Sequence, residues 1–286
     1  MSIATLIAKQ NQDGGWPYVR GGSWTEPTVY AILALQLAGE SPAAARGTAW
    51  LRSIARRDGG WPPRASVDQS TWVTGLVAMI DPESIGERHH RRAIDWLLDT
   101  TGEESSRIYR LREWLLGNAP SKADRDFPGW PWVPGTAAWV GPTAIAILAL
   151  EKEHHRQPSP GIQHRIRAGR EFLLGRACDD GGWNHGSSRP LGYPSHAYPE
   201  TTGLALAALR GVRSLRVDQG LEVAKRFLAE CHSADALNWL RLGLRAHGQL
   251  PPGYCTPSGV EYRTIPEESL DLVMSAAEQG RDSFWG

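Results

Sequence analysis

Cysteine is scarce in this chain of 286 residues, which contains only Cys178, Cys231 and Cys255. Three widely spaced cysteines do not make a disulfide framework, and this favours a reducing compartment such as the cytoplasm. The longest apolar runs, such as "TAIAILAL", fall well short of the roughly 20 residues that a membrane-spanning helix needs. No basic stretch followed by an apolar core opens the chain, so we expect no secretory signal. The sequence predicts a cytoplasmic protein and leaves peripheral membrane contact open.

Net charge is also lacking, since Lys plus Arg and Asp plus Glu both number 31. No segment is dense in basic residues, so we expect no nucleic-acid partner. The sequence has no Gly-rich phosphate loop followed by Lys-Ser or Lys-Thr, and no G-x-S-x-G turn of the hydrolase type. These absences argue against P-loop nucleotide chemistry and against a serine hydrolase of the α/β type.

Tryptophan, by contrast, is abundant, with 13 residues against four Phe. Four of them end a recurring motif: "QDGGW", "RDGGW", "DFPGW" and "DDGGW", at Trp16, Trp61, Trp130 and Trp183. An amphipathic helical pattern precedes most copies, glycine stops it, and a polar loop leads to a nearly apolar run such as "VYAILALQLAG". A helix without a polar face is buried. The sequence is therefore a repeat of paired helices, one amphipathic and one buried.

The repeat predicts two concentric layers of helices. A closed ring suits such an array because it leaves no apolar end face exposed, so we expect an all-α fold, an (α/α)6 toroid of about six hairpins forming a single domain over residues 1–286. Outer helices are expected near 2–10, 42–56, 88–100, 161–175, 217–230 and 267–279, and inner helices near 26–39, 68–80, 104–117, 141–152, 200–211 and 233–247.

The Gly-Gly-Trp turn followed by a buried helix resembles the QW motif of the terpenoid cyclase and protein prenyltransferase toroids. The repeats are similar to those of squalene–hopene cyclase over nearly the whole chain. The resemblance implies that the four repeated tryptophans are structural and that a cavity opens at the N-terminal ends of the inner helices. Residues just ahead of those helices, or in the mouth loops, are then candidates for substrate binding: Trp24, Arg64, Trp72, Trp132, Trp139 and Tyr198.

The same resemblance implies a catalytic acid. Class II terpene cyclases carry a D-x-D-D motif whose middle Asp donates a proton, and "SVDQ" at residues 66–69 occupies that place. Only Asp68 keeps its carboxylate, because Ser66 and Gln69 replace its partners. If Glu26 and Glu200 face Asp68 across the cavity, repulsion raises the pKa of one acid. The plainer alternative is that each acid caps, or lies in the first turn of, the helix that follows.

The resulting prediction is an isoprenoid-processing enzyme that resembles class II terpene cyclases. Asp68 is the expected proton donor, Glu26 and Glu200 its electrostatic partners, and aromatic rings would stabilise the carbocation. The substrate is expected to be a small isoprenoid or another lipid, and no cofactor is expected. The alternative is a toroid module that binds a lipid or a peptide without catalysis, which the two lost motif carboxylates favour.

Two metal-dependent alternatives are weaker. Protein prenyltransferases bind zinc through Asp-x-Cys and a downstream His, but Ser70 stands where this chain would need the thiolate. Lanthionine cyclases use a Cys-His pair, and Cys231-His232 precedes an inner helix. Neither Cys178 nor Cys255 stands at a comparable helix start, so we expect a buried cysteine with a capping His232, and no metal site. Of the other histidines, His185 and His196 lie in the loop over the presumed mouth.

Overall fold

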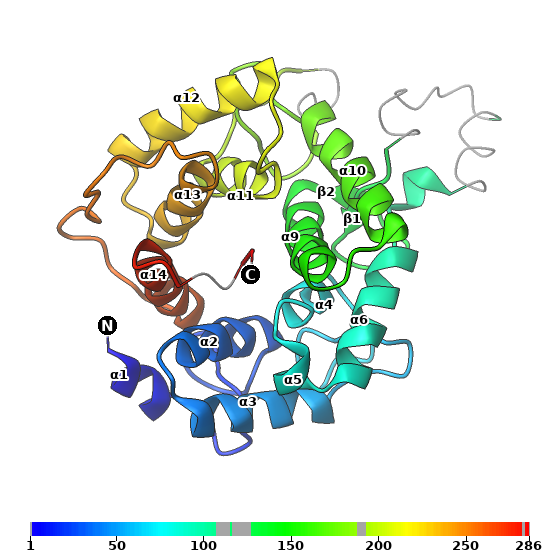
Figure 1. Ribbon diagram of the computed structural model, residues 1–286, viewed down its shortest axis with the longest axis vertical. Helices are drawn as coiled ribbons and strands as arrows, with labels where there is room; N and C mark the ends of the chain where they lie inside the picture. The colour runs from blue at the N-terminus through cyan, green and yellow to red at the C-terminus, as the bar shows by residue number, and fades with distance from the viewer. Residues whose placement is uncertain (1, 107–114, 116–126, 188–192, 282–283, 286) are drawn as a thin grey trace. The chain divides into compact units, whose positions relative to one another are not determined.

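The computed structural model describes residues 2–106, 115, 127–187, 193–281 and 284–285. The regular secondary structure of this part of the chain is helical apart from one short strand pair, as Figure 1 shows. The helices are α1 (Ile3–Ala8), α2 (Thr25–Leu37), α3 (Ser41–Ser53), α4 (Val73–Val77), α5 (Pro82–Ile85), α6 (Glu87–Asp99), α9 (Val140–Arg156), α10 (Pro160–Gly175), α11 (Pro199–Ala208), α12 (Leu215–Glu230), α13 (Ala234–Ala246) and α14 (Ile265–Glu278). Strand β1 (Trp130–Pro131) pairs with β2 (Ala138–Trp139) in the antiparallel sense. The all-α prediction is confirmed.

Most predicted helices begin and end within a few residues of their expected bounds, but α4 is shorter than the expected 68–80. Thr71 forms an antiparallel bridge with Trp61, and its N–H donates to the Trp61 carbonyl at 2.9 Å. This bridge keeps the chain extended just before the helix, which starts only at Val73. Most of the helix expected at 104–117 lies outside the described residues.

The chain divides into two compact units, and each is described by itself. The first comprises Met1–Asp99, Ala149–Gln157 and Glu261–Gly286, and the second comprises Thr100–Leu148 and Pro158–Val260. The expectation of one domain over residues 1–286 stays a prediction.

In the first unit, α2 is the central buried helix. Its residues from Thr25 to Leu35 are buried apart from Glu26, and α3 and α14 pack against it. Helix α14 was expected in the outer layer, and that assignment is wrong. It lies beside α2 (Figure 1), and it buries Leu270, Val273 and Met274 together with much of its remaining surface. Its pattern misleads because short and polar residues, such as Ser269, are buried along with the apolar ones.

In the second unit, α11 and α13 approach each other at the level of their backbones. A Cβ atom at Gly203 would overlap the backbone of Trp239 and Leu240, and one at Gly243 would overlap the carbonyl of Gly203. Only glycine permits this approach. Helix α12 packs against both, with Ser214 capping its N-terminus by accepting a hydrogen bond from the Val217 N–H.

The first glycine of the Asp-Gly-Gly-Trp turn is required by its backbone conformation and by its surroundings. The first glycine takes a left-handed conformation, with φ of 98° at Gly14, 97° at Gly59 and 103° at Gly181. In the first two repeats it also touches the backbone of the following outer helix, because an added Cβ would lie 2.6 Å from the Arg46 carbonyl oxygen or 2.8 Å from that of Arg92. A side chain is excluded at this position by both conformation and space.

The tryptophan of each turn is fully buried and fixes the helices around it. The indole N–H of Trp16, Trp61 and Trp183 donates to the carbonyl ten residues earlier, on Leu6, Leu51 and Leu173, at 2.7–2.9 Å. We call this contact the Trp clamp. The backbone N–H of the same tryptophan donates to a threonine Oγ1 of the following inner helix, at 2.9–3.0 Å. One residue therefore joins the preceding helix to the following one, which supports the structural role predicted for these tryptophans.

The tryptophan ring also packs against the next outer helix. An added Cβ at Gly47 would lie 2.8 Å from the ring of Trp16, and one at Gly169 would lie 2.7 Å from the ring of Trp130. Gly220 lies against Trp183 in the same way. Glycine on these helices therefore gives room for the indole, at a cost in helix propensity of about 1 kcal/mol each.

The third repeat lacks the aspartate that precedes the two glycines in the other repeats. A glutamate from another part of the chain takes its place. In the first two repeats Asp13 and Asp58 accept hydrogen bonds from Ser23 Oγ and Ser70 Oγ at 2.7 and 2.8 Å. Phe127 stands in the equivalent place of the third. There the buried carboxylate of Glu104 accepts from the Ala138 N–H at 3.1 Å. The repeat is thus completed by a residue outside its own motif.

No helix in the part of the chain that the structure describes combines the length and the apolar character needed to cross a bilayer.

Candidate active site

The loops between each repeated tryptophan and the next inner helix carry the candidate residues. Each loop folds back so that its last residue bonds to the tryptophan that opens it. The N–H groups of Trp24, Thr71 and Tyr198 donate to the carbonyls of Trp16, Trp61 and Trp183, each at 2.9 Å. This backbone bond therefore fixes the start of each inner helix, and with it the side chains that precede the helix.

In the first unit this arrangement brings together an acid and three of its neighbours. The phenol of Tyr18 donates a hydrogen bond to Glu26 Oε2, in the first turn of α2. The Tyr18 ring meets Trp24 edge to face, with centroids 5.5 Å apart. The guanidinium of Arg64 lies over Trp24, 5.0 Å from the ring centroid, at a distance where a cation–π attraction operates. Burial, together with the charge of Glu26, raises the pKa of Tyr18 far above its usual value, so this phenol stays a donor.

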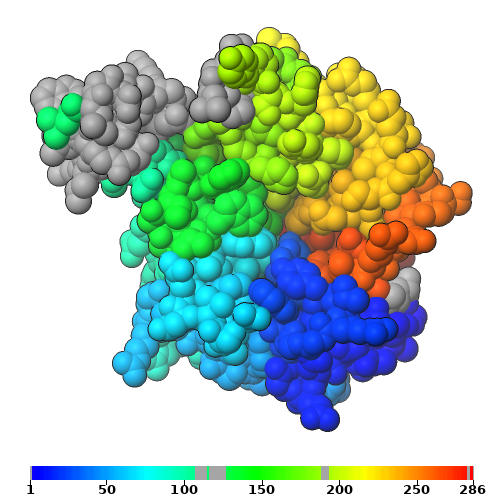
Figure 2. Space-filling view, turned by 180° about the vertical axis from the view of Figure 1, so that it is seen from behind, coloured from blue at the N-terminus to red at the C-terminus, as the bar shows by residue number. Residues whose placement is uncertain are grey.

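Contacts between neighbouring loops hold this group in place. Thr25 donates to the next loop twice, through its N–H to the Pro63 carbonyl at 2.9 Å and through Oγ1 to Pro62 at 2.6 Å. The Ile265 N–H at the start of α14 donates to the Tyr18 carbonyl at 2.8 Å. In Figure 2 the first repeat, in blue, and the second, in light blue to cyan, lie side by side on the surface.

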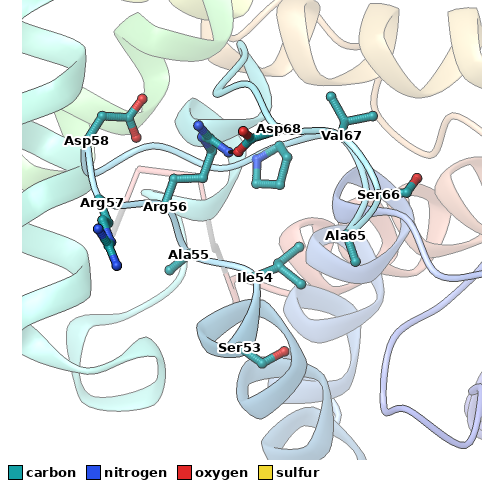
Figure 3. Close-up of a pocket in the computed structure, with 11 residues that line it drawn as sticks. Ser53, Ile54, Ala55, Arg56, Arg57, Asp58, Ala65, Ser66, Val67 and Asp68 are labelled. Atoms are coloured by element: carbon teal, nitrogen blue, oxygen red, sulfur yellow. Dashed lines mark hydrogen bonds and ion pairs between the residues drawn. The ribbon is translucent and has the colours of Figure 1, made fainter.

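Asp68 lies in a different setting. It borders an open pocket of about 650 Å³ formed by residues 53–58, Pro62 and residues 65–68. Figure 3 shows the guanidinium of Arg56 turned toward its carboxylate, with which it forms an ion pair. The side chain of Asp68 is 97% exposed. The hydrogen bond and the charge of Arg56 lower the pKa of Asp68, which favours the carboxylate over the acid.

The helix-cap alternative for Asp68 is wrong, because α4 starts five residues later and its N-cap is Trp72, without a capping side chain. Trp72 itself is half-buried. The first-turn alternative fits the two glutamates, since Glu26 and Glu200 lie in the first turns of α2 and α11. Such a position favours a carboxylate electrostatically.

In the second unit an acid, an imidazole and two exposed rings lie close together. His185 Nε2 is 3.4 Å from Glu200 Oε1, and the His185 ring lies 5.4 Å from that of Tyr198. The His185 carbonyl accepts from the Val140 N–H at 2.9 Å, which joins this loop to the start of α9. Trp139 covers the neighbouring Gly186, where an added Cβ would be 3.0 Å from the indole.

The two rings of this group are open to solvent or to a ligand, since Trp139 is 37% exposed and Tyr198 is 48% exposed. Trp132, half-buried, packs near Gly141 at the start of α9. We call Trp132, Trp139, His185, Tyr198 and Glu200 the α11 cluster. It combines an imidazole–carboxylate pair with aromatic rings.

The structure thus assembles the predicted residues into local groups. Trp24, Arg64 and Glu26 share one group and Trp132, Trp139, Tyr198 and Glu200 share another, whereas Asp68 pairs with Arg56. Glu26 and Asp68 belong to the first unit and Glu200 to the second, so the convergence of the three acids stays a prediction. Sequence reasoning missed Tyr18 and Arg56. Their spacing from the repeated tryptophans, in "GGWPY" and "ARRDGGW", was the available signal.

The residues that the structure describes contain no group of three or more His, Cys, Asp or Glu side chains placed to hold a metal ion. Cys178 is buried, and this burial raises the pKa of its thiol. The expected roles of Cys231 and His232 are wrong. Cys231 is only half-buried, and Ser233 rather than His232 caps α13, because its hydroxyl accepts from the Ala236 N–H.

Comparison with known proteins identifies squalene–hopene cyclases as relatives. The squalene–hopene cyclase of Bradyrhizobium diazoefficiens is 25% identical in an alignment of 246 residues that covers 72% of this chain and 33% of that protein. A probable squalene–hopene cyclase of Sinorhizobium fredii is 22% identical in an alignment of 260 residues that covers 75% of this chain and 37% of that protein. The chain therefore spans about a third of the length of the curated relatives it matches. No family model matches it.

Solved structures show the fold. A GH8 endo-β-1,4-glucanase from an Achatina fulica gut metagenomic library aligns with a TM-score of 0.62 and 12% identity, over 98% of both chains. A type II terpene cyclase from Scytonema aligns with a TM-score of 0.55 and 16% identity, over 98% of this chain and 78% of that one. The chain has the α/α-toroid fold and resembles terpenoid cyclases in sequence. The fold alone fits more than one activity.

Proposed function

We propose that this protein is an isoprenoid-processing enzyme of the class II terpene cyclase type, with the α11 cluster as its site of proton transfer. The observation that carries the proposal is the pairing of Glu200 with His185 beside the exposed rings of Trp139 and Tyr198. The likeness in sequence to squalene–hopene cyclases supports an isoprenoid or a related lipid as the substrate.

The proposed reaction begins when the carboxyl group of Glu200 protonates a carbon–carbon double bond. A C–H bond forms, the π electrons are consumed, and the positive charge is left on the neighbouring carbon while Glu200 becomes a carboxylate. A second double bond of the substrate attacks that cation and closes a ring. Loss of a proton from the final cation ends the reaction, so substrate and product are isomers and no cofactor is consumed.

The neighbours of Glu200 have separate roles in this proposal. His185, whose side chain is half-exposed, exchanges protons between Glu200 and water. The faces of Trp139 and Tyr198 stabilise the migrating cation, because an aromatic ring attracts positive charge without acting as a strong nucleophile. Glu26, hydrogen-bonded to Tyr18, and Asp68, paired with Arg56, lie in the first unit, and the electrostatic role predicted for them stays a prediction.

A binding module without catalysis is the second candidate, and one observation favours it. Asp68 occupies the position of the proton donor implied by the resemblance, yet it is solvent-exposed and paired with Arg56. An acid held as an exposed carboxylate is suited to solubility or to ligand contact rather than to protonating an alkene.

Incubation of the full chain with isoprenoids of C10 to C30 and their diphosphates, followed by product analysis, tests the proposal. We expect cyclised isomers from at least one substrate. Glu200→Gln should lower the rate by about 10²–10⁴, the usual effect of removing a general acid. Glu222→Gln, at an exposed residue of α12, is the matched control and should leave the rate unchanged.

The outcomes separate the two candidates. Unchanged turnover in Glu200→Gln together with loss in Asp68→Asn would transfer the acid role to Asp68. Inertness of the unmodified chain toward every substrate, with isoprenoid binding retained, would favour the module.

A further inference from the structure

Asn184 stands where the other three repeats have proline. It directly follows the repeated tryptophan Trp183, and the residues in the same place of the earlier repeats are Pro17, Pro62 and Pro131. Asn184 is only 5% exposed. A buried side-chain amide needs hydrogen-bond partners, because an unsatisfied one carries a large desolvation cost. The partners of this amide therefore define its role in the fourth repeat.

The side chain of Asn184 bonds to the backbone on the far side of His185. Its Oδ1 accepts from the Gly186 N–H at 2.9 Å, and its Nδ2 donates to the Ser187 carbonyl at 2.8 Å. A backbone N–H only donates and a carbonyl only accepts, so these partners fix which end of the amide carries the oxygen. The amide thus folds residues 184–187 into a short turn that contains His185.

Neighbouring elements hold the beginning of the same turn. The Tyr198 N–H and Thr201 Oγ1 both donate to the Trp183 carbonyl, at 2.9 and 2.7 Å. The Val140 N–H, at the start of α9, donates to the His185 carbonyl at 2.9 Å. The backbone on each side of the His185 ring is therefore bonded, while the imidazole itself stays half-exposed.

The first repeat contains an equivalent pair of side chains. His185 and Tyr18 are each the second residue after a repeated tryptophan. Glu200 and Glu26 are each the second residue after the one that closes the loop. The Tyr18 phenol donates to Glu26, and His185 Nε2 is 3.4 Å from Glu200 Oε1. The repeat thus brings these two positions together, and only the fourth repeat fills the first of them with an imidazole, the side chain suited to proton exchange near neutral pH.

We propose that Asn184 is a positioning residue of the α11 cluster, which fixes its turn so that the His185 ring faces Glu200. In the first repeat a proline precedes Tyr18 and restricts its own φ through its ring. Asparagine lacks that restriction, and its two side-chain hydrogen bonds replace it. The consequence for catalysis rests on the function proposed above, in which His185 exchanges protons between Glu200 and water. The placement of the ring does not rest on it.

Nuclear Overhauser spectroscopy of the full chain, with labelled histidine and tyrosine, tests the placement without a substrate. We expect cross-peaks between the ring protons of His185 and Tyr198, whose centroids are 5.4 Å apart, and their loss in Asn184→Ala. Asn11→Ala is the matched control and should keep them, because the Asn11 amide holds the loop of the first repeat by donating to the Gly21 carbonyl at 3.0 Å. Cross-peaks retained in Asn184→Ala, or absent from the unmodified chain, would overturn the proposal.

A milder variant decides the question if Asn184→Ala does not fold. Asn184→Ser keeps a hydroxyl that accepts from the Gly186 N–H, but its side chain is too short to reach the Ser187 carbonyl as well. We expect weaker cross-peaks between His185 and Tyr198 in this variant. Cross-peaks of unchanged intensity would contradict the role given to Asn184.

Turnover of an isoprenoid tests the consequence for catalysis. Asn184→Ala should lower kcat about 10–10²-fold, since a displacement of about 1 Å costs up to about 10²-fold, and should leave KM unchanged. In a His185→Gln background the same change should have no further effect, because Asn184 acts through His185. An equal loss in both backgrounds would overturn the positioning role. Absence of turnover together with the expected cross-peaks would refute the proposed function and support the placement of His185 by Asn184.

Discussion

The guanidinium of Arg165 lies flat against the buried ring of Trp130, with its central carbon 3.3 Å from the ring centroid. The same side chain donates to three backbone carbonyls, those of Thr100, Pro128 and Gly129, at 2.6–3.2 Å. A planar, multi-donor cation is the one side chain that can make all of these contacts at once. Arg165 therefore holds together a repeat whose motif lacks the usual acid.

Arg165→Lys should destabilise the protein even though it keeps the charge. An ammonium cannot stack on the indole while reaching three carbonyls, so at least one buried acceptor is left unsatisfied. The expected loss in the free energy of unfolding is about 1.5–3 kcal/mol, the range for hydrogen bonds to charged groups. Urea denaturation measures it. Arg167→Lys, at an exposed residue of the same helix, is the control, and equal stabilities of the two variants would contradict the role given to Arg165.

Gly220→Ala should also destabilise the protein, against the trend of helix propensity. Alanine is favoured over glycine in a helix by about 1 kcal/mol, but a Cβ here overlaps the ring of Trp183. Overpacking of a core costs about 1–3 kcal/mol, and we expect it to prevail. The control is Gly161→Ala at an exposed site in α10, where the nearest atom is 3.8 Å away. A lower melting temperature in the control than in Gly220→Ala would refute this explanation.

His247 should make stability depend on pH. Burial lowers the pKa of its ring below the usual value of about 6.5, although the Leu206 carbonyl, 2.9 Å from Nε2, opposes the change. The unfolded chain then binds a proton more readily than the folded one. The contribution of His247 to the free energy of unfolding is therefore complete above pH 6.5 and is lost as the pH falls below that value.

His247→Gln cannot titrate and should flatten the decline in unfolding free energy between pH 7.5 and 5.5. Chemical denaturation at the two values measures the difference. The matched variant is His232→Gln, at an exposed residue, which should retain the slope of the unmodified protein. If the unfolding free energies of both variants decline equally between these pH values, His247 is not the source of the pH dependence.

Tyr18→Phe tests the group around Glu26. The variant keeps the edge-to-face contact with Trp24 and removes only the phenol that donates to Glu26. We expect a loss of about 1–3 kcal/mol in unfolding free energy, because a half-buried carboxylate loses a donor. Tyr193→Phe, at a side chain that is mostly exposed, provides the comparison and should be neutral within about 0.5 kcal/mol.

The fold could be predicted from the sequence because its signals are local and repeated. Glycine before a buried tryptophan, followed by an apolar helix, occurs in four copies, and each copy places two helices. The predictions failed where tertiary contacts override the local pattern. Thr71 is held extended by its bridge to Trp61, which shortens α4, and α14 is buried by α2 despite its polar residues.

The candidate site was harder to predict because side-chain pairing is not encoded in spacing. The sequence indicated Glu26, Asp68 and Glu200 from their places ahead of inner helices. The spacing of Tyr18 and Arg56 from the repeated tryptophans placed them beside the loops, but it did not specify that Tyr18 bonds to Glu26 or that Arg56 pairs with Asp68, because tertiary contacts set the paths of these loops. Glu104 is the clearest such case, because nothing near it in the sequence suggests that it serves the third repeat.

The backbone bond from the end of each loop to the carbonyl of its repeated tryptophan closes that loop through atoms that are near in the chain, and this has a consequence for how such proteins diversify. The segment between Trp16 and Trp24 is anchored at both ends, while a Cβ added at Gly21 or Gly22 within it would meet nothing within 4 Å. Residues can be inserted there without disturbing the helices, so selection is free to lengthen and recompose these segments. The scaffold and the chemistry it hosts can therefore evolve at different rates.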